Sequence, residues 1–430
     1  MISSDDTKLI DAEAEVVDAA VHGAEATEQE AVGVSAVLKI RDFRFALISG
    51  AILVFGFEMR AIAQSWLALE LTDSQAWVGA VNGLPALVMI ALSLLGGVAA
   101  DRFPKRNILL IVRLLMISLG LVVGYLVAVE AITIWALLGL ALVQGGIAAF
   151  GMPANQSLVV ELVGRDNVLT ATSLVQSLAG LSLVLGPALG GFILGIWGVA
   201  PVYFAVAGIH AVAAVGILMV RNRKVHRSAE SKSAMTEIAE GLRFVRGNSL
   251  VRMLMIMNVL GMFAGFMFPL IPVYARDVLE VGEAGYGMLM GAFGLGGVAG
   301  TIVLITAGKV EKKGRIVIAA AVIWLFGTFI FAFSRNYYLS LATMVVMGAG
   351  GIGYVTTINA MVQMTIPDEL RGRVTSLFSI TMQLFPLGFF AGGMLAATTS
   401  NEIAMMVSGV GVMLPVVIIF GASKGFRAMT

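Results

Sequence analysis

Long apolar runs alternate with short polar segments along most of the chain, beginning at Ala46. Most runs reach about 20 residues, the length that a helix needs to cross a bilayer core of about 30 Å. The pattern therefore predicts twelve membrane-spanning helices, at residues 46–69, 77–99, 107–129, 132–154, 168–197, 200–220, 252–274, 286–308, 316–333, 336–360, 374–397 and 403–421.

The composition agrees with a membrane protein. Hydrophobic residues make up 59% of the chain and charged residues only 13%, against about 25% charged in a typical soluble domain. A soluble fold of 430 residues cannot bury this much apolar surface, so lipid has to cover the rest. We expect an all-α polytopic membrane protein with the lipid bilayer as its surroundings.

Cysteine content and net charge exclude several other classes. The chain has no Cys, which excludes a disulfide scaffold and any thiolate metal site. The formal net charge is +1, whereas a nucleic-acid-binding protein needs a clustered basic surface. We expect no metal, no cofactor and no nucleic-acid partner.

The N-terminal segment 1–38 differs in kind from the rest of the chain. It holds nine acidic residues and a single basic one, Lys8, which is the wrong charge for a secretory signal peptide. It also lacks an apolar face wide enough to dock on a membrane or a core. We interpret it as an acidic disordered cytoplasmic tail; a regulatory tail is the alternative.

The distribution of Lys and Arg predicts the orientation in the membrane. With the N-terminus in the cytoplasm, 25 of the 28 Lys and Arg residues fall in cytoplasmic segments or at their edges. Arg276 and Arg335 fall on the other side, and Arg60 falls within a span. Because cytoplasmic loops carry an excess of Lys and Arg, both termini are predicted to be cytoplasmic.

An internal repeat divides the chain into two parts. The segment GGVAADRFPKR at the turn between the second and third spans recurs 210 residues later as AGKVEKKGR. This predicts an N-terminal six-helix half at 39–221, a C-terminal half at 251–430, and a cytoplasmic linker at 222–250 between them. The second half of the linker has an apolar face beside Arg243 and Arg246, which is typical of an amphipathic helix on the inner leaflet.

Two motifs resemble those of the major facilitator superfamily. The loop after the second span carries Gly97, Asp101, Arg102, Lys105 and Arg106, which match the loop 2–3 signature of that superfamily, with Pro104 in place of its second glycine. The fifth span carries Gly186, Pro187, Gly190 and Gly191, which resemble the core of a helix-5 motif associated with exporters. Ser182 replaces an earlier glycine of that motif.

The resemblance implies a fold and a mechanism. It runs from Lys39 to Phe426, and AIAQSWLALELTDS, ADRFPKR and GLRFVRGN are similar to the bacterial branch of enterobactin-exporter-like and macrolide-efflux-like proteins. It implies two six-helix halves, a central cavity between helices 1, 4, 7 and 10, and a location in the bacterial cytoplasmic membrane. It also implies that Asp101 contacts the N-terminus of helix 11, near Thr375, as a latch between the halves; anchoring at the lipid headgroups is the alternative.

Glu58 and Arg60 are the residues most suited to carry chemistry. Both lie near the middle of the first span, where a charge is costly unless it has a partner or faces water. Residues two apart on a helix point about 200° away from one another, so one should face the cavity and the other a neighbouring helix. A hydrophobic environment favours a neutral carboxyl, so Glu58 could bind and release a coupling proton. A structural carboxylate is the alternative.

Other polar residues within the spans could line a substrate cavity. Each could equally make a hydrogen bond between helices. The candidates are Gln64, Gln144, Asn258, Thr356, Thr357 and Asn359.

The sequence carries no catalytic motif, so we expect no enzyme activity. It has no HExxH, no P-loop and no serine elbow, and without a nucleotide site transport cannot be driven directly by ATP. We expect a monomeric, proton-coupled exporter of a small amphipathic or hydrophobic compound, such as a drug-like molecule or a siderophore, that works by alternating access. A metabolite importer or facilitator, and a scaffold or receptor that has lost transport, are the alternatives.

Overall fold

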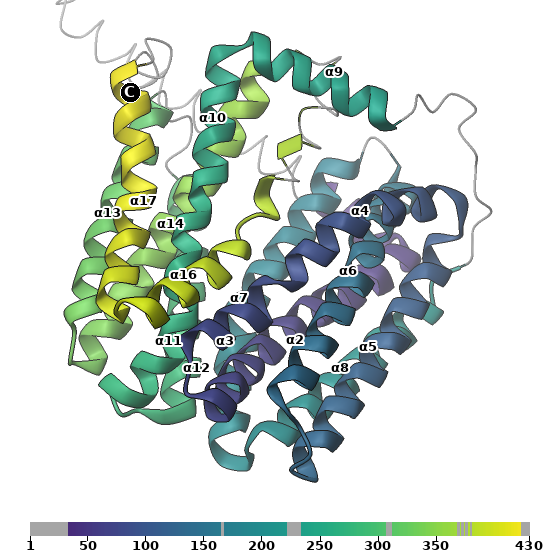
Figure 1. Cartoon of the computed structure of the whole chain (residues 1–430). Coiled ribbons are helices and arrows are strands. Elements are labelled where there is room, and N and C mark those ends of the chain that lie inside the picture. The colour runs from purple at the N-terminus through teal and green to yellow at the C-terminus, as the bar shows by residue number, and fades with distance from the viewer. Residues whose placement is uncertain are drawn as a thin grey trace, which may run out of the picture.

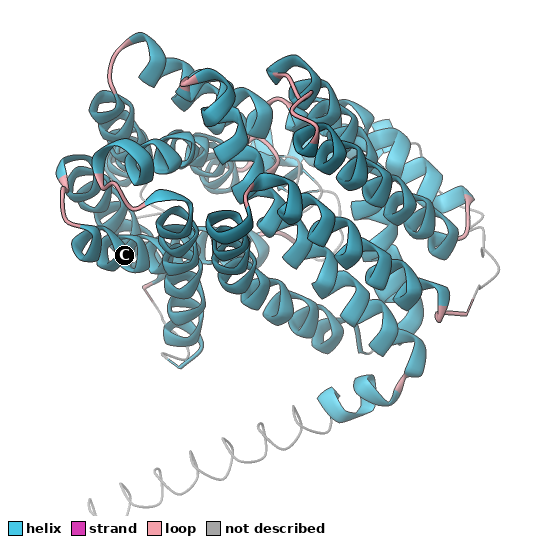
Figure 2. Ribbon diagram, turned by 90° about the horizontal axis from the view of Figure 1, so that it is seen from below, coloured by secondary structure: helices cyan, strands magenta, loops and turns pink. Residues whose placement is uncertain are grey.

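The computed structural model describes residues 33–164, 167–221, 234–306, 312–367, 370, 374, 377–378 and 381–422. The described residues are 91% helical and include no strand, which confirms the all-α prediction (Figure 2). Most of the predicted acidic tail, the first part of the linker, and Glu311, Arg371 and Thr375 lie outside the described residues.

The helices between residues 41 and 218 form the first helix set. The second predicted span is broken at Leu84, because the following Pro85 has no N–H to continue the helical hydrogen bonds. Pro187, by contrast, lies inside a continuous helix. The helices of this set are α2 (Arg41–Thr72), α3 (Gln75–Gly83), α4 (Pro85–Arg102), α5 (Lys105–Ala128), α6 (Ile134–Val163), α7 (Val168–Trp197) and α8 (Val199–Leu218).

The linker helix α9 (Ala234–Gly247) leads into the second helix set, between residues 249 and 422. Its first span is not one regular helix: α10 (Ser249–Leu260) continues as the 3₁₀ segment η2 (Gly261–Leu270), α11 (Ile271–Val273) and the wide turn η3 (Tyr274–Val278). The set is completed by α12 (Gly282–Thr306), α13 (Lys313–Phe333), α14 (Tyr337–Thr365), α16 (Leu387–Thr398) and α17 (Asn401–Ala422).

The lengths of these helices agree with the twelve predicted spans. Eleven helical stretches of the described chain are long and apolar enough to cross a membrane, and α16 is a shorter apolar helix that falls in the eleventh predicted span. Many large apolar side chains on these helices are exposed, among them Leu169 and Ile305, as expected of surfaces that face lipid. The protein is therefore a multi-pass membrane protein.

The two helix sets touch mainly along two pairs of helices, α7 with α12 and α3 with α16. We call the end of the bundle that carries α9 the α9 end, and the end where α2 joins α3 the α2–α3 end. α4 leans away from α10 toward the α9 end (Figure 1). The helix sets are thus packed together at the α2–α3 end and diverge at the α9 end.

Exposed aromatic residues gather at the α2–α3 end. Tyr125, Trp135, Trp197 and Tyr338 are each more than half exposed and lie at helix ends on this side of the bundle. Tyrosine and tryptophan are enriched where a membrane meets water. This ring of residues therefore indicates where the bilayer surface crosses the protein.

Candidate functional site

A cavity of about 560 Å³ lies between the two helix sets. Its walls come from α2, α3, α4, α6 and α7 on one side and from α10, η2, α12, α13, α14, α16 and α17 on the other. The volume falls in the range of small-molecule sites, about 300–1,000 Å³. The position between two sets that diverge at one end is suited to a binding site with alternating exposure.

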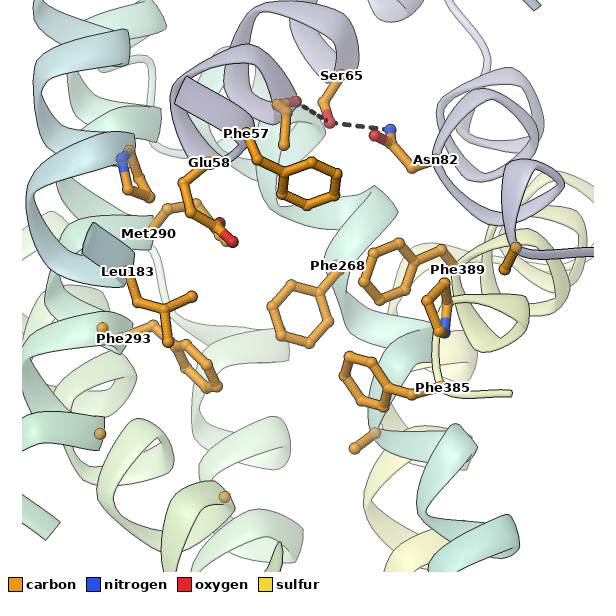
Figure 3. Close-up of a pocket in the computed structure, with 18 of the residues that line it drawn as sticks. Phe57, Glu58, Ser65, Asn82, Leu183, Phe268, Met290, Phe293, Phe385 and Phe389 are labelled. Carbon is orange, nitrogen blue, oxygen red and sulfur yellow. Dashed lines mark hydrogen bonds between the residues drawn. The ribbon is translucent and has the colours of Figure 1, made fainter. Parts of the chain in front are cut away.

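Aromatic side chains form much of one wall. Phe268 lies at the centre of this wall, with ring centroids 5.1 Å from Phe389, 5.4 Å from Phe293 and 5.8 Å from Phe385. Figure 3 shows Phe268, Phe385 and Phe389 together across the cavity from Glu58. Aromatic faces bind apolar surface and also attract cations, so the wall suits a hydrophobic or amphipathic guest.

The 3₁₀ segment η2 brings Phe268 to the cavity. A side chain on Gly265 would meet the backbone oxygen of Phe385 at 2.8 Å, so this glycine allows η2 to pack closely against the chain before α16. Just before the segment, Asn258 Nδ2 donates a hydrogen bond of 2.6 Å to Thr381 Oγ1. Stretches of 3₁₀ helix within a helix often mark hinges, and this one lies beside the cavity.

Glu58 lines the cavity. Its carboxyl group points into the open space (Figure 3), and no hydrogen bond or ion pair connects it to any other described residue. A side chain on Gly186 would approach Glu58 Cβ to 2.7 Å, so Gly186 is what allows α7 to pack against α2 at this level. Glu58 is therefore an unpaired carboxyl group held inside the membrane-spanning bundle.

Arg60 also lines the cavity, and a polar network holds its side chain. It donates a hydrogen bond to Gln64 Oε1, and Gln64 Nε2 donates to the Val81 carbonyl at 2.7 Å. The Arg60 guanidinium also lies 4.9 Å from the ring centroid of Phe57. Arg60 is thus fixed by α2 and α3, and it does not form an ion pair with Glu58.

Three of the six polar residues expected at the cavity lie on it, and three do not. Gln64, Gln144 and Asn258 line the cavity, whereas Thr356, Thr357 and Asn359 are absent from its walls. Tyr354 and Val355 are the last residues of α14 to reach it. Asn359 lies one turn beyond Val355 on the same face, where it accepts a hydrogen bond from Gln363.

The residues of the predicted latch make contacts within the first helix set. Lys105 Nζ lies 3.2 Å from Glu161 Oε2 on α6, and Arg106 donates to the Leu218 carbonyl at the end of α8, at 2.8 Å. Asp101 and Arg102 are exposed and bond to no residue of the second set that the structure describes. The basic residues therefore anchor the start of α5 in this conformation. Gly97 has open space at its Cβ position, and the tight contact is made by Gly96, against the Ala149 carbonyl.

The helix-5 motif packs α7 against two helices at once. A side chain on Gly190 would meet the Met59 carbonyl of α2 at 3.0 Å, and one on Gly287 would meet the Pro187 carbonyl at 2.8 Å. Gly191 and Gly287 face each other so closely that neither has room for a Cβ. The motif thus allows α7 to sit between α2 in the first set and α12 in the second.

The α2–α3 end is closed by contacts between the two sets. Arg276 Nη1 of η3 lies 2.8 Å from Asp73 Oδ1 after α2, and Gln75 Nε2 donates to Asn401 Oδ1 at 3.1 Å. Further into the bundle, Gly79 of α3 packs directly against the Phe389 backbone of α16. The cavity is therefore shut at this end.

Sequence reasoning missed a third charged residue in the interior. Arg113 is among the 25 Lys and Arg residues assigned to cytoplasmic segments or their edges, but its side chain is 0% exposed and none of its three guanidinium nitrogens has a hydrogen-bond partner. It lies eight residues after the start of α5 at Lys105, about 12 Å into the helix. The sequence did contain a sign of this burial, because Arg113 is the seventh residue of the expected third span.

Comparison with known proteins gives a consistent picture. A family profile described as "Transmembrane secretion effector" matches residues 33–424. The chain is 25% identical to the multidrug efflux pump Tap of Mycolicibacterium fortuitum over 366 residues, which cover 82% of this chain and 87% of that protein. It is 24% identical to the staphyloferrin A transporter of Staphylococcus aureus (80% of this chain, 87% of the other) and 24% identical to the enterobactin exporter of Salmonella choleraesuis (90% and 94%).

Solved structures share the fold at lower identity. A nucleoside transporter, NupG, superposes with a TM-score of 0.71 at 13% identity, covering 90% of this chain and 98% of its own. A bacterial homologue of the iron transporter ferroportin, in an inward-facing state, gives 0.69 at 17% identity, with 89% and 99% covered. These likenesses concern the arrangement of the helices.

Proposed function

Since the chain belongs to the transmembrane secretion effector family of the major facilitator superfamily, and is a membrane transporter and not an enzyme, we propose that it exports an amphipathic or hydrophobic organic compound in exchange for protons. The observation that carries this proposal is the 560 Å³ cavity between the two helix sets, with the unpaired carboxyl group of Glu58 pointing into it.

The position of Glu58 supplies a way to couple substrate and proton. Burial in an apolar environment favours the neutral form of a carboxyl group, whereas contact with bulk water favours the charged form. A cavity that opens to one side and then the other would therefore let Glu58 take up a proton on one side and release it on the other. A substrate that fills the cavity in between would compete with the proton, which is the requirement for exchange.

The closed end and the open end define one state of an alternating-access cycle. From the distribution of Lys and Arg we infer that the α9 end faces the cytoplasm, with both termini there. We propose that the membrane is the bacterial inner membrane. The described structure is then open to the cytoplasm and closed toward the outside by the Arg276–Asp73 pair and the α3–α16 contact. Export requires these outer contacts to break while contacts form at the α9 end.

The walls of the cavity favour a drug-like compound over an acidic siderophore as the substrate. The aromatic rings around Phe268 provide apolar and cation-attracting faces. Among the described residues, Glu58 is the one acid on the walls, and the one base there, Arg60, is held by Gln64 and the ring of Phe57. In its charged form Glu58 repels an anion and attracts a cation. We therefore expect lipophilic cations and neutral amphiphiles to be the better substrates.

Reconstituted protein tests this function directly. Proteoliposomes with an imposed pH difference should accumulate a fluorescent lipophilic cation, such as ethidium, on the side with the higher proton concentration. An ionophore that removes the pH difference should abolish this uphill movement. Equilibration without accumulation would show a facilitator instead, and no movement of any tested compound would favour a scaffold or receptor.

Single cysteines test the proposed orientation, because the chain has no cysteine of its own. Arg335 and Arg221 are both exposed and lie at opposite ends of the bundle, after α13 and after α8. In intact bacterial cells whose outer membrane has been made permeable, a maleimide that does not cross the inner membrane should label Arg335→Cys. Arg221→Cys should be labelled only after the cells are broken. Labelling of both variants in intact cells would contradict the orientation.

A further inference from the structure

A small second cavity lies inside the first helix set, between α2, α5, α6 and α8. Its volume is about 20 Å³, and its polar lining comes from Arg60, Gln64, Gln144, Tyr203 and His210. Arg60, Gln64 and Gln144 also line the central cavity. We propose that this second cavity binds a single small anion, such as chloride, which neutralises buried positive charge in the first helix set.

Three polar atoms around this cavity have no protein partner. They are Arg60 Nε, Tyr203 Oη and His210 Nδ1, and each is fully enclosed. Tyr203 and His210 are only 2% and 4% exposed. A buried donor left without a partner costs about 1–3 kcal/mol, and all three atoms can donate a hydrogen bond, His210 in the tautomer with its proton on Nδ1. Three donors around one small cavity are suited to an acceptor that carries negative charge.

The balance of charge around the cavity also favours an anion. Arg113 is fully buried and Arg60 is half-buried in this region, and His210 interacts electrostatically with both of them. The helices α5 and α8 contain no acidic residue, and α6 contains only Glu161, which pairs with Lys105 near the α9 end. On α2, Asp42 and Glu70 lie near opposite ends, and the central acid is Glu58, which faces the central cavity. Two cations inside the first helix set, one fully buried and one half-buried, thus have at most one acid near them.

The size of the cavity sets what the anion can be. A volume of about 20 Å³ holds about one water-sized species. Chloride is small enough to fit, whereas gluconate and other organic acids are too large. A water molecule could accept from the three donors, but it would leave the buried positive charge uncompensated. Isolated buried charges are far more costly than unpaired neutral groups, so a halide accounts for more of the observations than water does.

Thermal unfolding of the purified full-length protein measures this binding. A ligand that binds only the folded state raises the unfolding temperature as its concentration rises. With sodium chloride exchanged for sodium gluconate at constant ionic strength, we expect the unfolding temperature to rise with chloride and to saturate, and bromide should act in the same way. In Tyr203→Phe, which lacks the hydroxyl donor, half-saturation should need about tenfold more chloride or more.

A matched variant and a direct observation complete the test. Tyr125→Phe removes an exposed tyrosine hydroxyl from α5 and should leave the chloride response unchanged. A structure of the wild-type protein in bromide should show anomalous density between Arg60, Tyr203 and His210, and this result does not depend on how well any variant folds. Equal unfolding temperatures in chloride and gluconate, or a response that is the same in Tyr203→Phe, would overturn the proposal. So would the absence of bromide density.

Discussion

Replacing Glu58 by glutamine is expected to abolish transport driven by a pH difference while the protein still binds and exchanges substrate. Glutamine keeps the shape and the hydrogen-bonding capacity of the side chain but cannot carry a proton. A pH difference of one unit supports at most about tenfold accumulation when one proton is exchanged per substrate. In proteoliposomes, wild-type protein should approach this ratio, and Glu58→Gln should reach no accumulation at all.

Two further measurements separate loss of coupling from loss of folding or binding. Exchange of labelled for unlabelled substrate at equal concentrations needs no proton, so it should persist in Glu58→Gln. The thermal stability of the variant should not fall, because Glu58 has no ion-pair partner among the described residues and its removal strands no cation. Uphill transport by a well-folded Glu58→Gln variant would show that Glu58 does not carry the proton.

A matched acid on the same helix serves as the control. Glu70 lies three turns further along α2, outside the cavity walls, and accepts a hydrogen bond from Trp66 Nε1 at 2.7 Å. Glu70→Gln should therefore retain accumulation driven by the pH difference. A loss of accumulation in Glu70→Gln with normal transport in Glu58→Gln would move the coupling site to the rim of the bundle.

The membrane spans, and the two charged residues that are energetically most costly within them, could be predicted from the sequence because both depend on local properties. Each span is a continuous apolar stretch, and a charge in the middle of such a stretch, as at Glu58 and Arg60, is conspicuous. Arg113 escaped notice because it lies close to the basic loop after α4, where positive charge is expected. Its burial depends on the packing of neighbouring helices, which a single span does not reveal.

The aromatic part of the cavity wall and the depth of the cavity could not be predicted, since they depend on contacts between distant segments. Thr356 and Asn359 are on the expected helix, but they lie beyond the last turn of α14 that reaches the cavity. Phe268 meets Phe385 and Phe389 only because η2 and the chain before α16 pack together. The breaks at Leu84 and Gly261, which shape these walls, follow from proline and glycine at positions that hydropathy alone treats as continuous helix.

A substitution at the contact that closes the α2–α3 end should also have a large effect on transport. Gly79 of α3 leaves no room for a Cβ beside the Phe389 carbonyl, and Gly393 of α16 leaves none beside the Gln75 carbonyl. Backbone atoms cannot move aside as a flexible side chain can, so Gly79→Val should force α3 and α16 apart. Overpacking costs about 1–3 kcal/mol, which would shift the equilibrium away from this closed end by about 5- to 150-fold.

We therefore expect Gly79→Val to hold the protein open at the α2–α3 end and to reduce transport by a similar factor. Ala264 lines the cavity on η2, so a maleimide should label Ala264→Cys from the α9 end in the otherwise wild-type protein and from the α2–α3 end when Gly79→Val is added. Gly208→Val is the matched control, because Gly208 lies in α8 with open space at its Cβ position. Normal transport and unchanged labelling in Gly79→Val would mean that the close approach of α3 and α16 is not required for the transport cycle. Loss of transport with unchanged labelling would point instead to a local defect in folding.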